Sequence, residues 1–146
     1  MPTRTRRRRS PSSRAGEYVR EEIHHIREGK HGARSAKQAI AIGLSKARRA
    51  GVKLPPPKPG MASARTRRQA MRESSRAERH EPVSPRRSAA MHRRLEREGR
   101  AAGSHRALSA QAREAARRRG PAARSRSAQK AARTRARRRA QRGRRS

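Results

Sequence analysis

RAGEYVREEIHHIREGKHGARSAKQAIAIGLSKARRAGVKLPPP, residues 14–57, is the stretch that decides the fold, because it alone carries a packing pattern. It contains all four isoleucines of the chain and its sole aromatic residue, Tyr18. From Met61 to Ser146 there is no isoleucine and one lysine, Lys130. So sharp a shift in composition indicates a small module followed by a low-complexity tail.

The first half of this stretch predicts an amphipathic helix. Val19, Ile23 and Ile26 follow helical spacing, and Gly29 is expected to end the helix. Glu22 lies near the middle of the apolar stripe, where a lone carboxylate fits badly. We therefore expect Glu22 to pair with a basic residue across the module.

The second half predicts another helix with a thin core. Ser35 followed by Gln38 is a capping box that favours a helix start at Ser35, and Gly51 is expected to end the helix. Two helices with so little apolar volume are marginal, so we expect the hairpin to fold fully only as a homodimer or with the tail and a polyanion bound. Most of the expected buried residues are small and let helices approach closely: Ala36, Ala39, Ile40, Gly43, Leu44 and Ala47.

The remaining sequence predicts disorder. A chain of 146 residues with 29% hydrophobic content and no Phe, Trp or Cys cannot fill a core of ordinary size. The expected fold class is mostly α and disordered, with an N-terminal two-helix hairpin and a tail whose helices form only on binding. The expected parts are a basic disordered arm (1–13), a two-helix module (14–54), a proline-rich linker (55–60) and a basic Arg/Ala-rich tail (61–146). Serines that begin tail segments are either N-caps of those induced helices or a chance of the composition: Ser63, Ser88, Ser109 and Ser127.

The formal charge of +34 determines the expected partner class. A chain of this charge density repels itself, and nucleic acid is the polyanion that would compact it. Binding through phosphates depends little on the nucleic-acid sequence, and its affinity falls steeply as the salt concentration rises. No apolar run approaches 18 residues, so we expect no membrane partner and a cytoplasmic, nucleoid location. The residues expected to bind nucleic acid are Arg6, Arg7, Arg8, Arg9, Arg34, Lys37, Lys46, Arg48, Arg49, Lys53, Arg117, Arg118, Arg119, Arg137, Arg138 and Arg139.

Catalysis and cofactors are not expected. The chain has no aspartate, no Ser-His-Asp set and no glycine-rich phosphate loop. His24, His25 and His31 cluster in the sequence, but adjacent helical positions point about 100° apart and no H-E-x-x-H spacing is present. The sequence therefore predicts a non-enzymatic protein without a metal site.

A family resemblance supports this interpretation. REEIHHIREGKHGARSAKQAIAIGLSKARRAGVKLPPP, together with the later SHRALSAQAREAARRRGPAARS, is similar to small basic bacterial proteins that carry a domain of unknown function. Members of that group are labelled uncharacterised or DNA-binding, which implies DNA binding here without assigning any residue. The tail also resembles bacterial histone H1-like proteins in composition, although those proteins favour lysine over arginine.

The function expected from these observations is sequence-nonspecific DNA binding and condensation of the nucleoid-associated type. An RNA-binding or ribosome-associated basic protein is the main alternative, since arginine-rich segments fold on structured RNA as well. Specific reading by a helix-turn-helix would use Arg34, Lys37 and Gln38, but the sequence shows no third supporting helix. A membrane-active cationic peptide would need an apolar face of Trp, Phe and Leu that this chain lacks.

Overall fold

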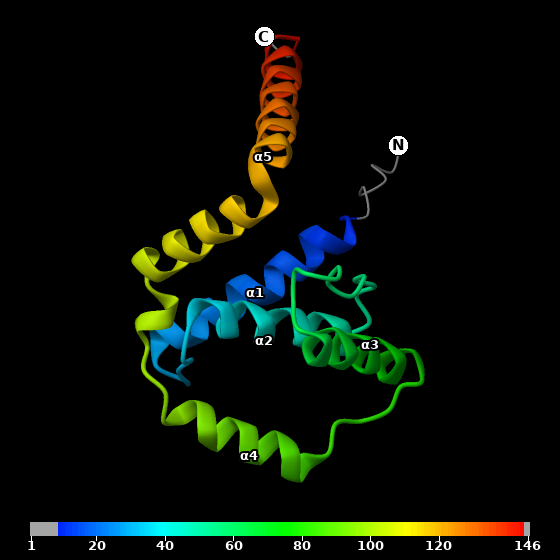
Figure 1. Ribbon diagram of the computed structural model, residues 1–146, viewed down its shortest axis with the longest axis vertical. Helices are drawn as coiled ribbons and strands as arrows, with labels where there is room; N and C mark the ends of the chain where they lie inside the picture. Colours follow the sequence, from blue (N-terminus) through cyan, green and yellow to red (C-terminus); the bar gives the residue numbers. More distant parts are fainter. Residues whose placement is uncertain (1–8, 145–146) are drawn as a thin grey trace, which may run out of the picture. The chain divides into compact units, whose positions relative to one another are not determined.

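The computed structural model describes residues 9–144, which fold into five α-helices and one short 3-10 helix (Figure 1). This architecture corrects the prediction of a mostly disordered chain, because helices continue through most of the segment expected to be a disordered tail. The elements in chain order are α1 (Pro11–Glu28), α2 (Ala36–Arg49), α3 (Ala64–Glu78), α4 (Pro85–Glu96), η1 (Ala101–Gly103) and α5 (His105–Gly143).

Local preferences explain why the tail is helical. Alanine and arginine are among the strongest helix formers, and serine caps supply the first turns. Ser63 accepts a hydrogen bond from the Thr66 amide at the start of α3, and Ser104 accepts one from Ala107 at the start of α5. The prediction of disorder rested on repulsion between the basic side chains. These side chains are exposed, so water and salt screen the repulsion.

The predicted cap positions are right in one case of four. Ser63 is the N-cap of α3. Ser88 lies inside α4, and both Ser109 and Ser127 lie inside α5. The helices they were expected to start begin earlier, at a proline in α4 and after Ser104 in α5.

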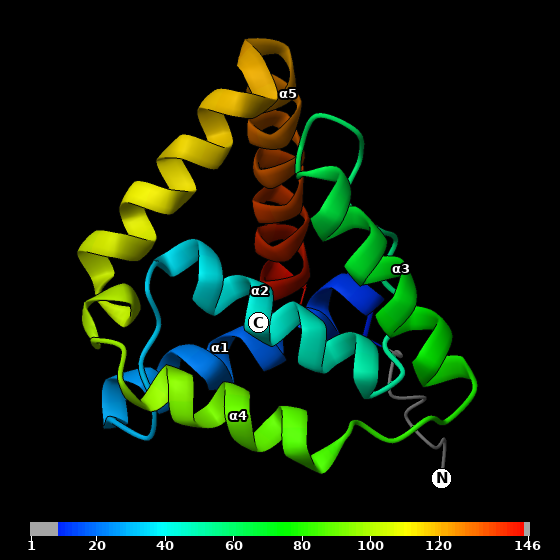
Figure 2. The same ribbon diagram turned by 60° about the horizontal axis from the view of Figure 1, so that its bottom comes forward.

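The described chain divides into two compact units, with the boundary after Leu108. In the first unit, α1 and α2 lie side by side and α3 packs on α2 (Figures 1 and 2). The second unit consists of the remainder of α5.

Small residues hold α1 and α2 close together, as the sequence predicts. Ala39 and Ala47 are fully buried, and a Cβ added at Gly43 would lie 2.6 Å from the Cα of Val19. Ile40 and Leu44 are half-buried at the edge of this contact. Ile26, Ala33, Ala39 and Ala102 form one buried cluster, and Ala15, Ala47 and Val52 form another.

The helix boundaries follow the predicted caps. Ser35 accepts a 3.1 Å hydrogen bond from the Gln38 amide at the start of α2. Gly29 ends α1 with φ of 80°, a left-handed conformation that glycine adopts without strain. At its other end α1 begins at Pro11, capped by Ser10, which places its start before the expected Arg14.

A later part of the same chain completes the thin core of the hairpin. The Gly32 amide donates a 2.8 Å hydrogen bond to the Leu95 carbonyl, and the Ala33 amide donates one of 3.1 Å to Gly99. Arg27 Nε donates a 2.7 Å hydrogen bond to the Gly103 carbonyl. Residues 95–103, which belong to the expected tail, thus supply burial that the sequence had attributed to a second copy or to the tail together with a polyanion.

The long helix α5 is bent in its middle. Gly120 has φ of 79° and ψ of 169°, which lies outside the helical region, and Pro121 follows it. Proline clashes with a helical conformation of the residue before it, and glycine is the residue that tolerates the alternative. The kink therefore separates α5 into two straight segments.

Candidate nucleic-acid interface

The segment of α5 that follows the kink is the most basic and most accessible part of the described chain. Residues 121–143 contain nine basic side chains and no acidic one. None of the residues of α5 is buried. A helix without a buried face has no core of its own to pack, so its side chains remain accessible to a ligand.

Helical spacing divides these nine residues between two opposite faces. A face defined by i, i+3 and i+4 relations gathers five arginines, and a second face about half a turn away gathers four further basic residues. We call them the arginine face and the mixed face. The arginine face consists of Arg124, Arg135, Arg138, Arg139 and Arg142, and the mixed face of Arg126, Lys130, Arg133 and Arg137.

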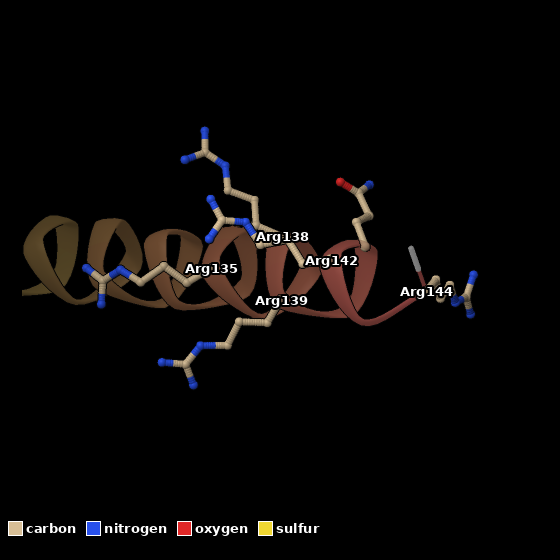
Figure 3. Close-up of a pocket in the computed structure, with 6 residues that line it drawn as sticks. Arg135, Arg138, Arg139, Arg142 and Arg144 are labelled. Atoms are coloured by element: carbon tan, nitrogen blue, oxygen red, sulfur yellow. The ribbon is translucent and has the colours of Figure 1, made fainter. Parts of the chain in front are cut away.

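The end of α5 shows how these side chains are presented (Figure 3). Arg138 and Arg142 extend toward the same side of the helix, and Arg139 extends to another (Figure 3). Together with Arg135 and Arg144 they surround an open, shallow region of the surface. Guanidinium groups in this arrangement can donate paired hydrogen bonds to phosphate oxygens.

The basic cluster before the kink is partly neutralised. Glu114 Oε2 lies 3.7 Å from Arg117 Nε, and Glu114 Oε1 lies 3.2 Å from Arg118 Nε. Arg119 is exposed. These three predicted residues and Arg137, Arg138 and Arg139 all lie on the surface of α5, on either side of Gly120.

The predicted residues of the N-terminal module divide into outward and inward side chains. Arg34, Lys37, Arg49 and Lys53 are exposed. Arg9 is exposed and pairs with Glu17. Arg6, Arg7 and Arg8 lie outside the described residues.

Lys46 and Arg48 were expected to bind nucleic acid, but the structure gives both a place within the protein. Lys46 Nζ pairs with the buried carboxylate of Glu22, and Arg48 is 8% exposed. The pair confirms the expectation that Glu22 finds a basic partner across the module. Lys46 is paired within the protein and Arg48 is buried, so we leave both out of the proposed interface.

Sequence-specific reading by α2 is also constrained. The third helix that the sequence did not show is present, because α3 packs on α2. However, Gln38 Oε1 accepts a 2.6 Å hydrogen bond from the Arg34 amide. The glutamine side chain that would read a base is therefore used at the start of its own helix.

Sequence reasoning missed a buried cluster around Glu22. This side chain is 1% exposed, and His31, which is 8% exposed, lies beside it. His31 Nε2 is 3.0 Å from Glu22 Oε2, and His25 Nδ1 is 3.5 Å from Glu22 Oε1. Glu22 and His25 are three residues apart and share a helix face, which was visible in the sequence. The approach of His31 depends on the turn after α1 and was not.

A comparison with known protein families matches the N-terminal part of the chain. Residues 11–58 match the model of the Family of unknown function (DUF6496). No curated protein and no solved structure shows significant similarity to the chain.

The segment that matches DUF6496 contains α1, α2 and the proline-rich run after them. It includes Glu22, His25, His31 and Lys46, so the whole buried cluster belongs to the matched segment. Both basic faces of α5 lie outside it. A domain of unknown function in the N-terminal part of the chain is thus confirmed, in agreement with that part of the resemblance. None of the described helices is apolar enough over a sufficient length to cross a membrane.

Proposed function

We propose that this protein binds DNA largely without regard to sequence and condenses it, as a non-enzymatic protein of the nucleoid-associated type. The observation that carries the proposal is the segment 121–143 of α5, with nine basic residues, no acidic residue and no buried side chain. The basic side chains of this helix have no acidic neighbours in the segment, so DNA phosphates can serve as their partners. Neutralising those phosphates would release the counterions condensed on the DNA.

The two basic faces support condensation in addition to binding. A helix with cations on one side covers one duplex. The arginine face and the mixed face point in opposite directions, so one helix can contact phosphates of two DNA segments. Bridging of this kind lowers the repulsion between duplexes, which is what condensation requires.

The test is a salt titration of binding to a labelled duplex of 30 base pairs. In one variant the five arginines of the arginine face are replaced by glutamine. The slope of log K against log salt decreases in magnitude by about 0.9 for each lost phosphate contact, so five lost contacts should decrease it by about 4.5. A matched control replaces five exposed arginines around α3 by glutamine: Arg65, Arg68, Arg72, Arg76 and Arg79.

The control variant distinguishes an effect of the α5 interface on the salt slope from an effect of the total charge. Both variants lose five charges, and circular dichroism checks that both remain helical. A slope change confined to the α5 variant supports the proposal. Equal changes in the two variants would overturn the assignment to α5.

A structured RNA of equal length distinguishes the alternative of an RNA-associated protein. Tighter binding to RNA with a shallower salt slope would indicate shape-specific contacts and would overturn the DNA proposal. Sedimentation of long duplex DNA by the intact protein, and its loss when the mixed face is replaced by glutamine, tests bridging.

A further inference from the structure

We propose that Glu22, His25 and His31 form a binding site for a zinc-like divalent transition metal ion. The site is independent of the proposed DNA interface, and it revises the expectation from sequence that the histidines bind no metal. One ligand atom from each residue lies within 4.8 Å of the other two. Two imidazoles and one carboxylate are a ligand set that zinc accepts, with a further position left for water.

The observed separations suit ligands of one ion. Two ligand atoms at about 2.0–2.2 Å from zinc in a tetrahedral arrangement lie about 3.3–3.6 Å apart. His31 Nε2 is 3.0 Å from Glu22 Oε2, and His25 Nδ1 is 3.5 Å from Glu22 Oε1. Small side-chain rotations would bring these atoms into the coordination sphere of a single ion.

The hydrogen bonding of His31 argues that a cation belongs in this position. Its Nδ1 lies 2.9 Å from the Gly32 carbonyl oxygen, which can only accept, so Nδ1 donates. A metal-bound histidine usually donates its second ring nitrogen in this way. In the neutral ring this leaves a lone pair on Nε2, the atom that lies 3.0 Å from Glu22 Oε2.

Glu22 Oε2 is the atom that such a cation would satisfy. It is buried and has no hydrogen-bond partner among the described residues, although His31 Nε2 lies 3.0 Å away. The two atoms are thus close without the alignment of a hydrogen bond. A buried carboxylate oxygen without a donor is costly, and a metal ion would remove that cost.

Lys46 is the competitor for this site. Its Nζ pairs with Glu22 Oε1, but 42% of its side chain is exposed, so it can turn into solvent when an ion binds. His25, with 23% of its side chain exposed, leaves an approach from the surface. The charge of +34 on the chain disfavours unspecific cation binding, so binding observed at low metal concentration must come from a built site.

The experiment is titration of the intact protein with Co²⁺ and Zn²⁺, followed by the visible absorption of Co²⁺ and by calorimetry. The expected result is one ion per chain, displacement of Co²⁺ by Zn²⁺ and no binding of Mg²⁺. We expect His31→Ala and Glu22→Gln each to weaken binding more than about 100-fold, beyond the loss caused by outer-shell substitutions. Lys46→Met is expected to tighten binding, because it removes the competing ammonium group.

His24→Ala is the matched control. His24 is adjacent to His25, is exposed and pairs with Glu28 at 2.9 Å, outside the cluster. The His24→Ala variant should bind Co²⁺ and Zn²⁺ with the same affinity as the unaltered protein. Equal weakening in His24→Ala and His31→Ala, or no Co²⁺ spectrum in the folded, unaltered protein, would overturn the proposal. Glu22→Gln keeps the size of the side chain, and circular dichroism of each variant separates loss of the site from loss of the fold.

Discussion

Gly43 of α2 lies directly against the backbone of Val19 in α1, so close that a Cβ at position 43 would be 2.6 Å from the Val19 Cα. Real side chains do not approach backbone atoms to this distance. The two helices can therefore keep their present separation only if residue 43 has no side chain.

Gly43→Ala should accordingly destabilise the protein, even though alanine favours a helix. Overpacking costs about 1–3 kcal/mol and the gain in helix propensity is about 1 kcal/mol. We expect a net decrease in the free energy of unfolding, measured by urea denaturation. Gly16→Ala is the control, because Gly16 lies within α1 and a Cβ there meets no atom within 4 Å. That variant should be more stable than the unaltered protein, and a gain in both variants would contradict the role of Gly43.

The contact between Gly32 and the segment after α4 gives a second prediction. A Cβ at Gly32 would lie 2.0 Å from the Glu98 carbonyl oxygen, so Gly32→Ala must displace residues 95–103. We expect faster hydrogen exchange of the Ala33 amide, whose acceptor is the Gly99 carbonyl. Gly99→Ala should leave this exchange unchanged, since a Cβ there meets nothing within 4 Å. Slow exchange in Gly32→Ala would show that the segment is not held in this way.

The N-cap of α2 gives a third prediction. Ser35 Oγ accepts from the Gln38 amide at 3.1 Å, so Ser35→Ala should lower the free energy of unfolding by about 1 kcal/mol. Ser35→Asp should retain most of the stability, because aspartate caps helices as well as serine does. A loss of equal size in both variants would show that the hydroxyl acts other than as a cap.

The C-terminal turn of α1 gives a prediction about pH. The pKa of Glu28 is lowered from 4.5, chiefly because the Lys30 side chain donates a hydrogen bond to it, with His24 contributing by its charge. A lowered pKa in the folded state stabilises the protein above the unfolded pKa, and this contribution is lost as pH falls through the folded pKa. We expect Lys30→Met to raise the pKa of Glu28 in an NMR titration. An unchanged pKa would assign the effect to the two histidines, His24 and His25, instead of Lys30.

The sequence was informative wherever a local rule determines structure. The spacing of Val19, Ile23 and Ile26 and the pair Ser35 and Gln38 are sufficient to predict α1, α2 and the cap between them. Even the partner of Glu22 could be anticipated, because a carboxylate within an apolar stripe needs a cation. Lys46, which supplies that cation, was instead expected to bind nucleic acid.

Two features could not be predicted because they depend on contacts distant in sequence. The Gly32 and Ala33 amides donate hydrogen bonds to the carbonyls of residues 95 and 99, and no local sequence pattern predicts these contacts. His31 meets Glu22 only because the turn after α1 folds back on it. The prediction of a disordered tail was wrong for a different reason. It gave the charge of the segment more weight than the helix propensity of alanine and arginine.

The hydrogen bond from Ala33 to Gly99 joins two ends of a loop that includes α2, α3 and α4. The segment similar to DUF6496 ends at residue 58, yet Ala102 is part of its buried cluster. The end of the family match and the end of the folded unit therefore do not coincide in this chain. A protease that cuts the exposed stretch between α3 and α4 would leave two peptides, each carrying one side of the same interior, and neither peptide alone could bury its side.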